Sequence, residues 1–279
     1  MKHDKTLLRK RFSRNLKTYD TLASVQRDIA GRIGSILADR VSSAAVARGA
    51  EIGAGTGFLT RHLVRLFPQA EWTVNDLVPE SRGYLPSTTP SGIPLRFSAG
   101  DGEVFPFENG RFDLIASAST VQWFDDLPGF IARAADSLSE NGILALSTFG
   151  PENFREITAA TGQGLEYFPL GRLANLITDN GLRILAKEEW IEQQRYPTPT
   201  DVLRHLRLTG VNAVAAERWT HSRLKKFEEE YRAAYAVAEA GADAGADAGA
   251  ENFPPGKSGE CVTLTFHPII LIAEKHPEP

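Results

Sequence analysis

The sequence contains one cysteine, Cys261, among its 279 residues. A single cysteine cannot form an internal disulfide, which is typical of proteins that work in the reducing cytoplasm. No apolar run reaches the ~18 residues that a membrane-spanning helix requires. The basic N-terminus also lacks the apolar segment that follows such a start in a secretory signal peptide. We therefore expect a cytoplasmic protein without a membrane partner.

Two further absences limit the function. His, Cys and Asp residues do not show the spacing of metal ligands, so we expect no bound metal. The net charge is −4, whereas a general nucleic-acid binder is usually basic, so we expect no nucleic-acid partner. The length allows one large domain or a core with a cap.

Three glycines at every second position, Gly53, Gly55 and Gly57, are the most informative local feature. They follow an apolar stretch, residues 44–50, that is typical of a buried strand, and they precede residues 58–67, whose apolar side chains have helical spacing. Glycine tolerates positive φ and lets a ligand approach the backbone closely. A turn from strand to helix also directs backbone N–H groups at a negative or electron-rich ligand. The segment predicts a ligand site, although a plain tight turn would contain the same glycines.

The spacing of these glycines separates two classes of ligand. A dinucleotide-binding fold requires G-x-G-x-x-G, but here the third glycine comes one residue early and Phe58 follows it. The form G-x-G-x-G after an acidic residue, Glu51, resembles motif I of the class I S-adenosylmethionine (SAM) methyltransferases. This resemblance implies that Glu51 binds the cationic amino end of the methionine and that the glycines make room for the cofactor. A nicotinamide-dependent oxidoreductase is the less favoured alternative.

Two later segments continue the same resemblance. Residues 71–76 alternate as a strand and end in Asp76, where a carboxylate suits the two hydroxyls of a ribose. A simple turn at the strand end would also explain Asp76, and the adjacent Leu77 is expected to touch the adenine. The sequence Gly-Asp-Gly-Glu-Val-Phe-Pro-Phe resembles a segment common in these methyltransferases. It implies that Asp101 accepts the adenine amino hydrogen and that the Gly102 N–H reaches a ring nitrogen.

The strand pattern predicts the fold. Residues 112–117 form the fourth expected strand, and by the switch-point rule Ser117 to Trp123 line the reacting end of the cofactor. Residues 143–149 form a fifth strand, and residues 262–273 form a reversed final strand. We expect an α/β fold with a Rossmann-like, seven-stranded, mostly parallel sheet, N-terminal helices and a helical cap. The expected parts are an N-terminal helical lid (1–40), a SAM-binding core (41–199), a helical cap with a flexible Ala/Gly/Asp tract (200–257) and the final strand of the core (258–279).

Further segments extend the likeness over nearly the whole chain. They include Val121-Gln122-Trp123, Ser147-Thr148-Phe149-Gly150 and Leu264-Thr265-Phe266-His267-Pro268. With them the chain resembles the malonyl-[acyl-carrier protein] O-methyltransferases. The resemblance implies SAM-dependent methylation of the free carboxylate of malonyl-acyl carrier protein, early in biotin synthesis. Two alternatives remain: a carboxyl methyltransferase of small acids such as trans-aconitate, and a SAM-binding assembly or regulatory protein without catalysis.

The implied reaction needs alignment more than acid–base chemistry. A carboxylate is already ionised at pH 7, because its unperturbed pKa is about 4. Alignment of the reacting atoms can supply about 7–11 kcal/mol. The resemblance implies that Tyr19, Gln122 and Trp123 form the wall around the methyl group. Arg155 and His205 are the candidate cations for the substrate carboxylate.

The first helix carries a local basic patch on an acidic protein. Lys10, Arg11 and Arg14 belong to it, and we expect them to bind the acidic acyl carrier protein, because clustered cations attract anions. A solvated helix face is the alternative interpretation. The sequence does not define the oligomeric state.

Overall fold

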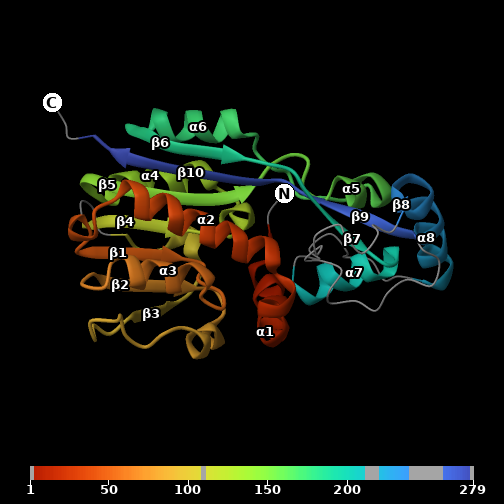
Figure 1. Ribbon diagram of the computed structural model, residues 1–279, viewed down its shortest axis with the longest axis horizontal. Coiled ribbons are helices and arrows are strands. Elements are labelled where there is room, and N and C mark those ends of the chain that lie inside the picture. Colours follow the sequence, from red (N-terminus) through yellow and green to blue (C-terminus); the bar gives the residue numbers. More distant parts are fainter. Residues whose placement is uncertain (1–2, 108–110, 211–219, 239–259, 277–279) are drawn as a thin grey trace.

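The computed structural model describes residues 3–107, 111–210, 220–238 and 260–276. Figure 1 shows a layered core and a smaller cap, with the first helix lying between them. Within the described residues, no helix is both long and apolar enough to cross a membrane. The helices and strands follow one another as α1 (Lys5–Leu22), α2 (Ser24–Arg40), β1 (Arg48–Ile52), α3 (Phe58–Leu66), β2 (Glu71–Asp76), β3 (Arg96–Ala99), β4 (Phe112–Ser117), α4 (Leu127–Ser137), β5 (Leu138–Phe149), α5 (Arg155–Thr161), α6 (Leu170–Asp179), β6 (Leu182–Glu189), β7 (Glu192–Tyr196), α7 (Pro199–Leu208), α8 (His221–Tyr235), β8 (Ala236–Ala238), β9 (Glu260–Phe266) and β10 (Pro268–Lys275).

The core is built on a sheet whose seven strands, in the part of the chain described, have the order β3-β2-β1-β4-β5-β10-β6. β10 is antiparallel to both of its neighbours, and the other neighbouring pairs are parallel. The strand order reverses between β1 and β4, so the carboxyl ends of these two strands border the crevice where ligands of such sheets bind. The prediction of a mostly parallel sheet with a reversed last strand is confirmed.

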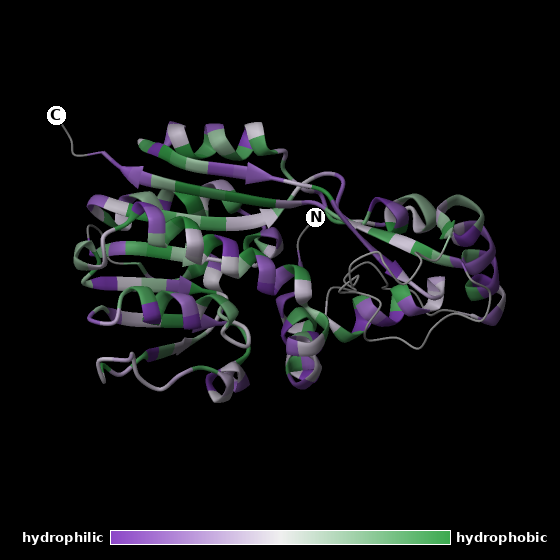
Figure 2. Cartoon of the chain, viewed as in Figure 1, coloured by the Kyte–Doolittle hydropathy of each residue, from purple (hydrophilic) through white to green (hydrophobic). Residues whose placement is uncertain are grey.

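Alternate residues of the central strands pack on opposite faces of this sheet. In β4, Leu114 belongs to the apolar cluster that contains α2 and α3, whereas Ile115 belongs to the cluster that contains α4 and α6. β10 shows the same alternation at Ile270 and Leu271. Both faces are therefore buried, as expected for parallel strands covered by helices. Figure 2 shows these apolar strands between helices that carry hydrophilic residues.

The N-terminal segment forms two helices that are joined at Ala23. α1 begins after Asp4, whose side chain accepts a hydrogen bond from the Leu7 amide at 2.9 Å and caps the helix. α2 packs on α3 in the core. α1 instead runs beside α7 of the cap, where Asn15 Nδ2 donates to the carbonyl of Arg207 at 2.8 Å. α1 thus connects the core with the cap, whereas α2, the other half of the expected lid, belongs to the core.

The cap contains a sheet as well as the predicted helices. β9 lies between β7 and β8 and is antiparallel to both, and α5, α7 and α8 pack with this second sheet. β7 falls in the range expected for the core, yet it pairs only with the cap strand β9 in the described structure. Its sequence, Glu-Gln-Gln-Arg-Tyr, lacks the apolar alternation that would have predicted a strand.

The single final strand expected at residues 262–273 is two strands. β9 belongs to the cap sheet and β10 to the main sheet, and only His267 separates them. At the other end of the cap, two residues separate β6 from β7. β6 and β10 are antiparallel neighbours, and the Trp190 amide donates to the Pro268 carbonyl at 3.2 Å. The Ala/Gly/Asp tract lies outside the described residues.

Candidate active site

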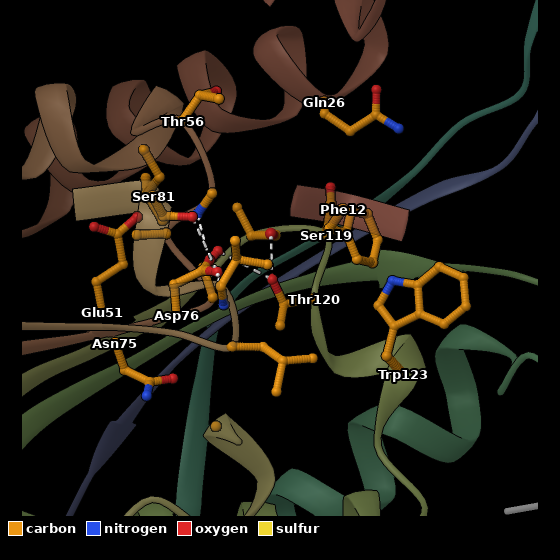
Figure 3. A pocket seen from close by; sticks show the side chains of 18 of the residues that line it. Phe12, Gln26, Glu51, Thr56, Asn75, Asp76, Ser81, Ser119, Thr120 and Trp123 are labelled. Carbon is orange, nitrogen blue, oxygen red and sulfur yellow. Dashed lines mark hydrogen bonds between the residues drawn. The ribbon is translucent and has the colours of Figure 1, made fainter. Parts of the chain in front are cut away.

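A cavity lies at the carboxyl ends of β1, β2 and β4, next to α1 (Figure 3). We call it the main cavity. It holds about 1010 Å³ of empty space, including the part that opens to solvent. Its lining comes from α1, α2, the glycine turn, the end of β2 and the loops that follow β3 and β4. Figure 3 shows Glu51 and Asp76 on one side of it and Phe12 and Trp123 on the other.

The glycine turn has the backbone conformation that its sequence predicts. Gly53, Gly55 and Gly57 have φ angles of 74°, 55° and 89°, in the left-handed region that favours glycine. A Cβ at Gly53 would lie 2.2 Å from Thr120 Oγ1, so this position also lacks the space for a side chain. Gly53 and Gly55 line the main cavity. Gly57 caps the start of α3 and is not among the lining residues, so its role is to shape the turn.

Glu51 is a buried carboxyl group at the end of β1. Its side chain lines the main cavity, the residue is 2% exposed, and Oε2 has no hydrogen-bond partner within the described structure. Burial raises the pKa of Glu51 to about 8. A buried carboxylate is costly unless a cation or donors neutralise it. The position therefore suits a ligand that brings a positive charge.

Asp76 ends β2 and organises the turn across from it. Its Oδ2 accepts a hydrogen bond from the Gly55 amide at 2.7 Å. Its Oδ1 accepts bonds from the Val78 amide at 2.7 Å and from Ser81 Oγ at 3.1 Å. Burial raises the pKa of Asp76, although these hydrogen bonds oppose the rise. Asp76 and the adjacent Leu77 both line the main cavity.

Asn75 also lines the main cavity, although no motif in the sequence indicated it. Its Nδ2 donates to the carbonyls of Ser98 and Gly100, at 3.0 and 3.1 Å, whereas its Oδ1 is buried and unpartnered in the described structure. A Cβ at Gly102 would lie 2.9 Å from this oxygen, so the glycine leaves the space beside it open. Asp101 and Gly102 line the cavity as predicted. The position of Asn75, a polar residue near the end of a buried strand, could have indicated that it faces the site.

The loop after β4 contributes to the lining, but not through its first residue. Ser117 is fully buried, and its Oγ donates to the carbonyl of Ile52 at 2.8 Å. It does not line the main cavity, contrary to the prediction, because its side chain joins β4 to β1 beneath the site. The next residues, Ala118, Ser119 and Thr120, do line the cavity. Ser117 therefore supports the site without facing the ligand.

The three residues predicted to surround the methyl group are close together. Tyr19 and Trp123 line the main cavity, and both also line a smaller adjoining cavity, which we call the side chamber. Gln122 lines only the side chamber; its Nε2 donates to the Ser119 carbonyl at 2.8 Å, and its Oε1 is buried without a partner in the described structure. Burial, and then the nearby Asp76 carboxylate, raises the pKa of Tyr19, so its hydroxyl is neutral at pH 7.

The structure contradicts both candidate cations for a substrate carboxylate. Arg155 begins α5 in the cap, where its Nη1 lies 3.1 Å from Glu152 Oε2, away from the lining of both cavities. His205 is 4% exposed and packs edge-on against Tyr196 and Phe266. Burial lowers the pKa of His205 to about 4, so the ring is neutral at pH 7. Neither residue is placed to hold a carboxylate at this site.

Lys10, Arg11 and Arg14 lie on α1. Lys10 and Arg14 are exposed and four residues apart, so they share one side of the helix, whereas Arg11 is partly buried. α1 contacts α7, on which Arg204 and Arg207 are also exposed. Exposed cationic side chains thus lie on both of two contacting helices.

Comparisons with known proteins define the class. The profile of the family described as "Methyltransferase domain" matches residues 50–146, the range that holds the glycine turn and the strand ends around the main cavity. The YcgJ protein from Bacillus subtilis has the same fold, with a TM-score of 0.57 at 15% identity over 89% of this chain and 100% of that one. A protein from Bacillus halodurans has a TM-score of 0.58 at 12% identity, over 88% and 99%. The fold is that of a class I SAM methyltransferase.

Relatives that align over most of their length narrow this class. A malonyl-[acyl-carrier protein] O-methyltransferase from Chlorobium luteolum is 37% identical over 82% of this chain and 88% of its own. Proteins of the same name from Bacteroides helcogenes and Haemophilus influenzae are 36% and 33% identical over 97% of this chain, and over 98% and 94% of their own lengths. The chain belongs to the malonyl-[acyl-carrier protein] O-methyltransferase family. It is a SAM-dependent methyltransferase.

Proposed function

We propose that this enzyme methylates the free carboxylate of a malonyl group carried by acyl carrier protein, in an early step of biotin synthesis. The names of its relatives support this acceptor. In the structure, the observation that carries the proposal is the buried carboxyl group of Glu51, whose Oε2 has no hydrogen-bond partner in the described structure, at one end of a cavity whose other end is aromatic. Such a cavity suits a ligand with a cationic end and a reactive group at a distance from it.

The residues of the main cavity fit SAM. Glu51 would bind the amino group of the methionine part, which supplies the missing positive charge. Asp76 Oδ2 receives one protein N–H bond and retains a lone pair for a ribose hydroxyl. Asn75 Oδ1 and the open space at Gly102 would accommodate the adenine edge beside Asp101. Among the residues described, no group of three or more His, Cys, Asp and Glu side chains is placed to hold a metal ion.

When bound, SAM supplies an electrophilic methyl group on a sulfonium sulfur. The chain's own residues then have three tasks: to bind the cofactor, to orient the acceptor and to exclude water. An ionised carboxylate needs no general base, which agrees with the neutral state of the Tyr19 hydroxyl. Tyr19 and Trp123 form part of the wall between the two cavities, where the acceptor and the methyl group would meet. Alignment at this wall is the main source of the expected rate enhancement.

The acidic acyl carrier protein would dock on the cationic side chains of α1 and α7. Lys10 and Arg14 project from α1, the helix that also lines the main cavity through its other residues. A carrier bound there would lie next to the site, because α1 joins the core to the cap. Electrostatic attraction of this kind mainly raises the rate of encounter.

A labelled methyl donor tests the proposal. The enzyme is incubated with SAM that carries a labelled methyl group and with malonyl-acyl carrier protein, and the products are separated by mass. We expect one labelled methyl group on the malonyl carrier protein and none on acetyl carrier protein, which lacks the free carboxylate. Free malonate and trans-aconitate serve as small-acid controls. Faster labelling of a free acid, or no labelling of the malonyl carrier protein, would contradict the proposed acceptor.

A further inference from the structure

The side chamber adjoins the main cavity through a shared wall. Five residues line both spaces, namely Phe12, Tyr19, Gln26, Ser119 and Trp123. The side chamber holds about 330 Å³ of empty space, including the part that opens to solvent. Because the same five side chains border both spaces, groups bound in the two spaces would be next to each other. The side chamber is therefore the natural place for the methyl acceptor.

Two residues from outside the cofactor motifs give the side chamber a fixed hydrogen-bond donor. Asn153 is 3% exposed and lies just after β5, and Tyr167 lies between α5 and α6; both line the chamber. Asn153 Oδ1 accepts a bond from the backbone amide of His267 at 3.3 Å, and its Nδ2 donates to Tyr167 Oη at 2.9 Å. A backbone amide can only donate, so the orientation of the Asn153 side chain is determined. Since Tyr167 Oη accepts from Asn153, its own hydrogen is available for a ligand.

No charged side chain lines the side chamber in the described structure. Burial raises the pKa of Tyr167, so its hydroxyl remains neutral. Ser119 Oγ and Gln122 Oε1 are buried there without partners in the described structure; the serine hydroxyl can donate to a ligand, whereas the amide oxygen can only accept. The main cavity contributes one cationic side chain, Lys5, but its Nζ is bonded to Glu103 Oε2 at 2.7 Å. An acceptor carboxylate in the side chamber would thus meet neutral donors.

Neutral donors suit the chemistry of carboxylate methylation. One carboxylate oxygen forms a bond to the methyl carbon while the carbon–sulfur bond breaks and its electron pair remains on sulfur. The carboxylate loses its charge in this step, and no proton is transferred. A cationic partner would stabilise the charged reactant more than the transition state, and it would slow the step. A neutral hydroxyl orients the carboxylate with a smaller penalty of this kind.

We propose that the side chamber binds the acceptor carboxylate and that the Tyr167 hydroxyl, oriented by Asn153, donates a hydrogen bond to one of its oxygens. This inference rests on the proposed function, because it concerns the acceptor of that reaction. Tyr167 is then a substrate-binding residue, and Asn153 is a positioning residue that acts through it. The chamber selects acyl groups that end in a carboxylate over those that end in a methyl group.

The variant Tyr167→Phe tests the proposal with malonyl-acyl carrier protein as substrate. A hydrogen bond to a charged group contributes enough that its loss should lower kcat/KM about tenfold to a hundredfold. The change should appear mainly in KM, because the bond is strongest while the carboxylate is charged. Affinity for SAM, measured by calorimetry, should stay within twofold. The control is Tyr231→Phe, which removes a buried cap hydroxyl that donates to the Thr263 carbonyl and lies outside both cavities.

A second variant, Asn153→Asp, reverses the hydrogen bond without changing the size of the side chain. The new carboxylate would accept the Tyr167 hydrogen and would repel the substrate, so kcat/KM should fall at least as far as in Tyr167→Phe. The outcomes separate the two proposals. Wild-type activity on malonyl carrier protein with an unchanged Tyr167→Phe variant overturns the side-chamber assignment alone. Absence of wild-type activity on that substrate overturns the proposed function and the assignment with it. An equal loss of SAM affinity in Tyr167→Phe would also overturn the assignment.

Discussion

Lys5 Nζ lies 2.7 Å from Glu103 Oε2 and 2.8 Å from the Trp123 carbonyl, so the first turn of α1 is fastened to two loops that border the main cavity. Burial alone would raise the pKa of Glu103, but the bonds from Lys5 and from the amides of Asp125 and Asp126 outweigh it, and the pKa is lowered. Glu103 is therefore charged at neutral pH. The pair holds α1 over the main cavity, where we propose that the cofactor binds.

Replacing Lys5 should loosen this lid. Lys5→Met keeps most of the apolar stem but removes the charge and its three donors. Because a partly buried pair of this kind contributes about 1 kcal/mol, we expect SAM to dissociate about five times faster, as measured by stopped-flow fluorescence or surface plasmon resonance. Lys10→Met, on the exposed side of the same helix, is the matched control. Equal dissociation rates for the wild type and Lys5→Met would show that α1 does not retain the cofactor.

Cofactor binding should release a proton from Glu51. Without a ligand, burial raises the pKa of Glu51 to about 8, so the group is mostly protonated at pH 6.5. An adjacent ammonium group favours the carboxylate and lowers this pKa. Calorimetry at pH 6.5, in two buffers of different ionisation enthalpy, should therefore detect release of about one proton, and affinity should increase from pH 6.5 to 8. The ligand's amino group, with a pKa of about 8, stays protonated at pH 6.5 and is not the source of the released proton.

The control is Glu51→Gln, which should bind SAM more weakly and release no proton. Proton release of the same size from that variant would contradict the assignment of the proton to Glu51.

The cationic side of α1 should affect the carrier-bound substrate alone. The double variant Lys10→Glu and Arg14→Glu should raise KM for malonyl-acyl carrier protein about fivefold to tenfold at low salt, and the effect should shrink as salt screens the charges. Affinity for SAM should not change. Arg40→Glu with Arg65→Glu, two exposed positions on α2 and α3, is a control of equal charge. A similar KM increase in the control would indicate a general charge effect.

His205 should make the folded enzyme sensitive to acid. Its pKa is lowered from 6.5 to about 4 by burial in the cap. Between these values the unfolded chain binds more protons, so the free energy of unfolding should decrease as the pH falls from about 6.5 towards 4, by up to ~3 kcal/mol. Above pH 6.5 this contribution is constant. Urea unfolding of the wild type and of His205→Leu at pH 7.5 and 5 measures it. A stability difference between the two proteins that is the same at both pH values would contradict it.

The sequence predicted the core because its signals are local. A buried strand, a glycine turn and an acidic strand end each occupy one short stretch, and the order of such stretches defines this sheet. The cap was harder to predict, since β7 has no apolar face and β9 and β10 form one nearly continuous run of buried, mostly apolar residues. The break between them at His267 depends on which sheet each half joins. That choice is made by contacts far away in the sequence.

The same difference between local and long-range signals explains why only part of the candidate site could be predicted from the sequence. Glu51, Asp76 and Asp101 belong to recognisable sequence motifs. Asn153 and Tyr167 are brought together only by the tertiary structure, and no sequence motif contains them. The assignment of His205 was wrong, although a signal was present. His205 follows Val202 by three positions and precedes Leu206, so all three share the buried side of α7.

The part of the cap from β7 to β9 is in effect an elaborated hairpin between the neighbouring strands β6 and β10: two residues join β6 to β7, and one residue joins β9 to β10. This arrangement also divides the chain between the two cavities. The residues that line the main cavity all precede the end of β5, whereas Asn153, Tyr167 and the strands and helices of the cap come after it. Substitutions after β5 can therefore change the side chamber, through Asn153 and Tyr167, without altering any residue that lines the main cavity.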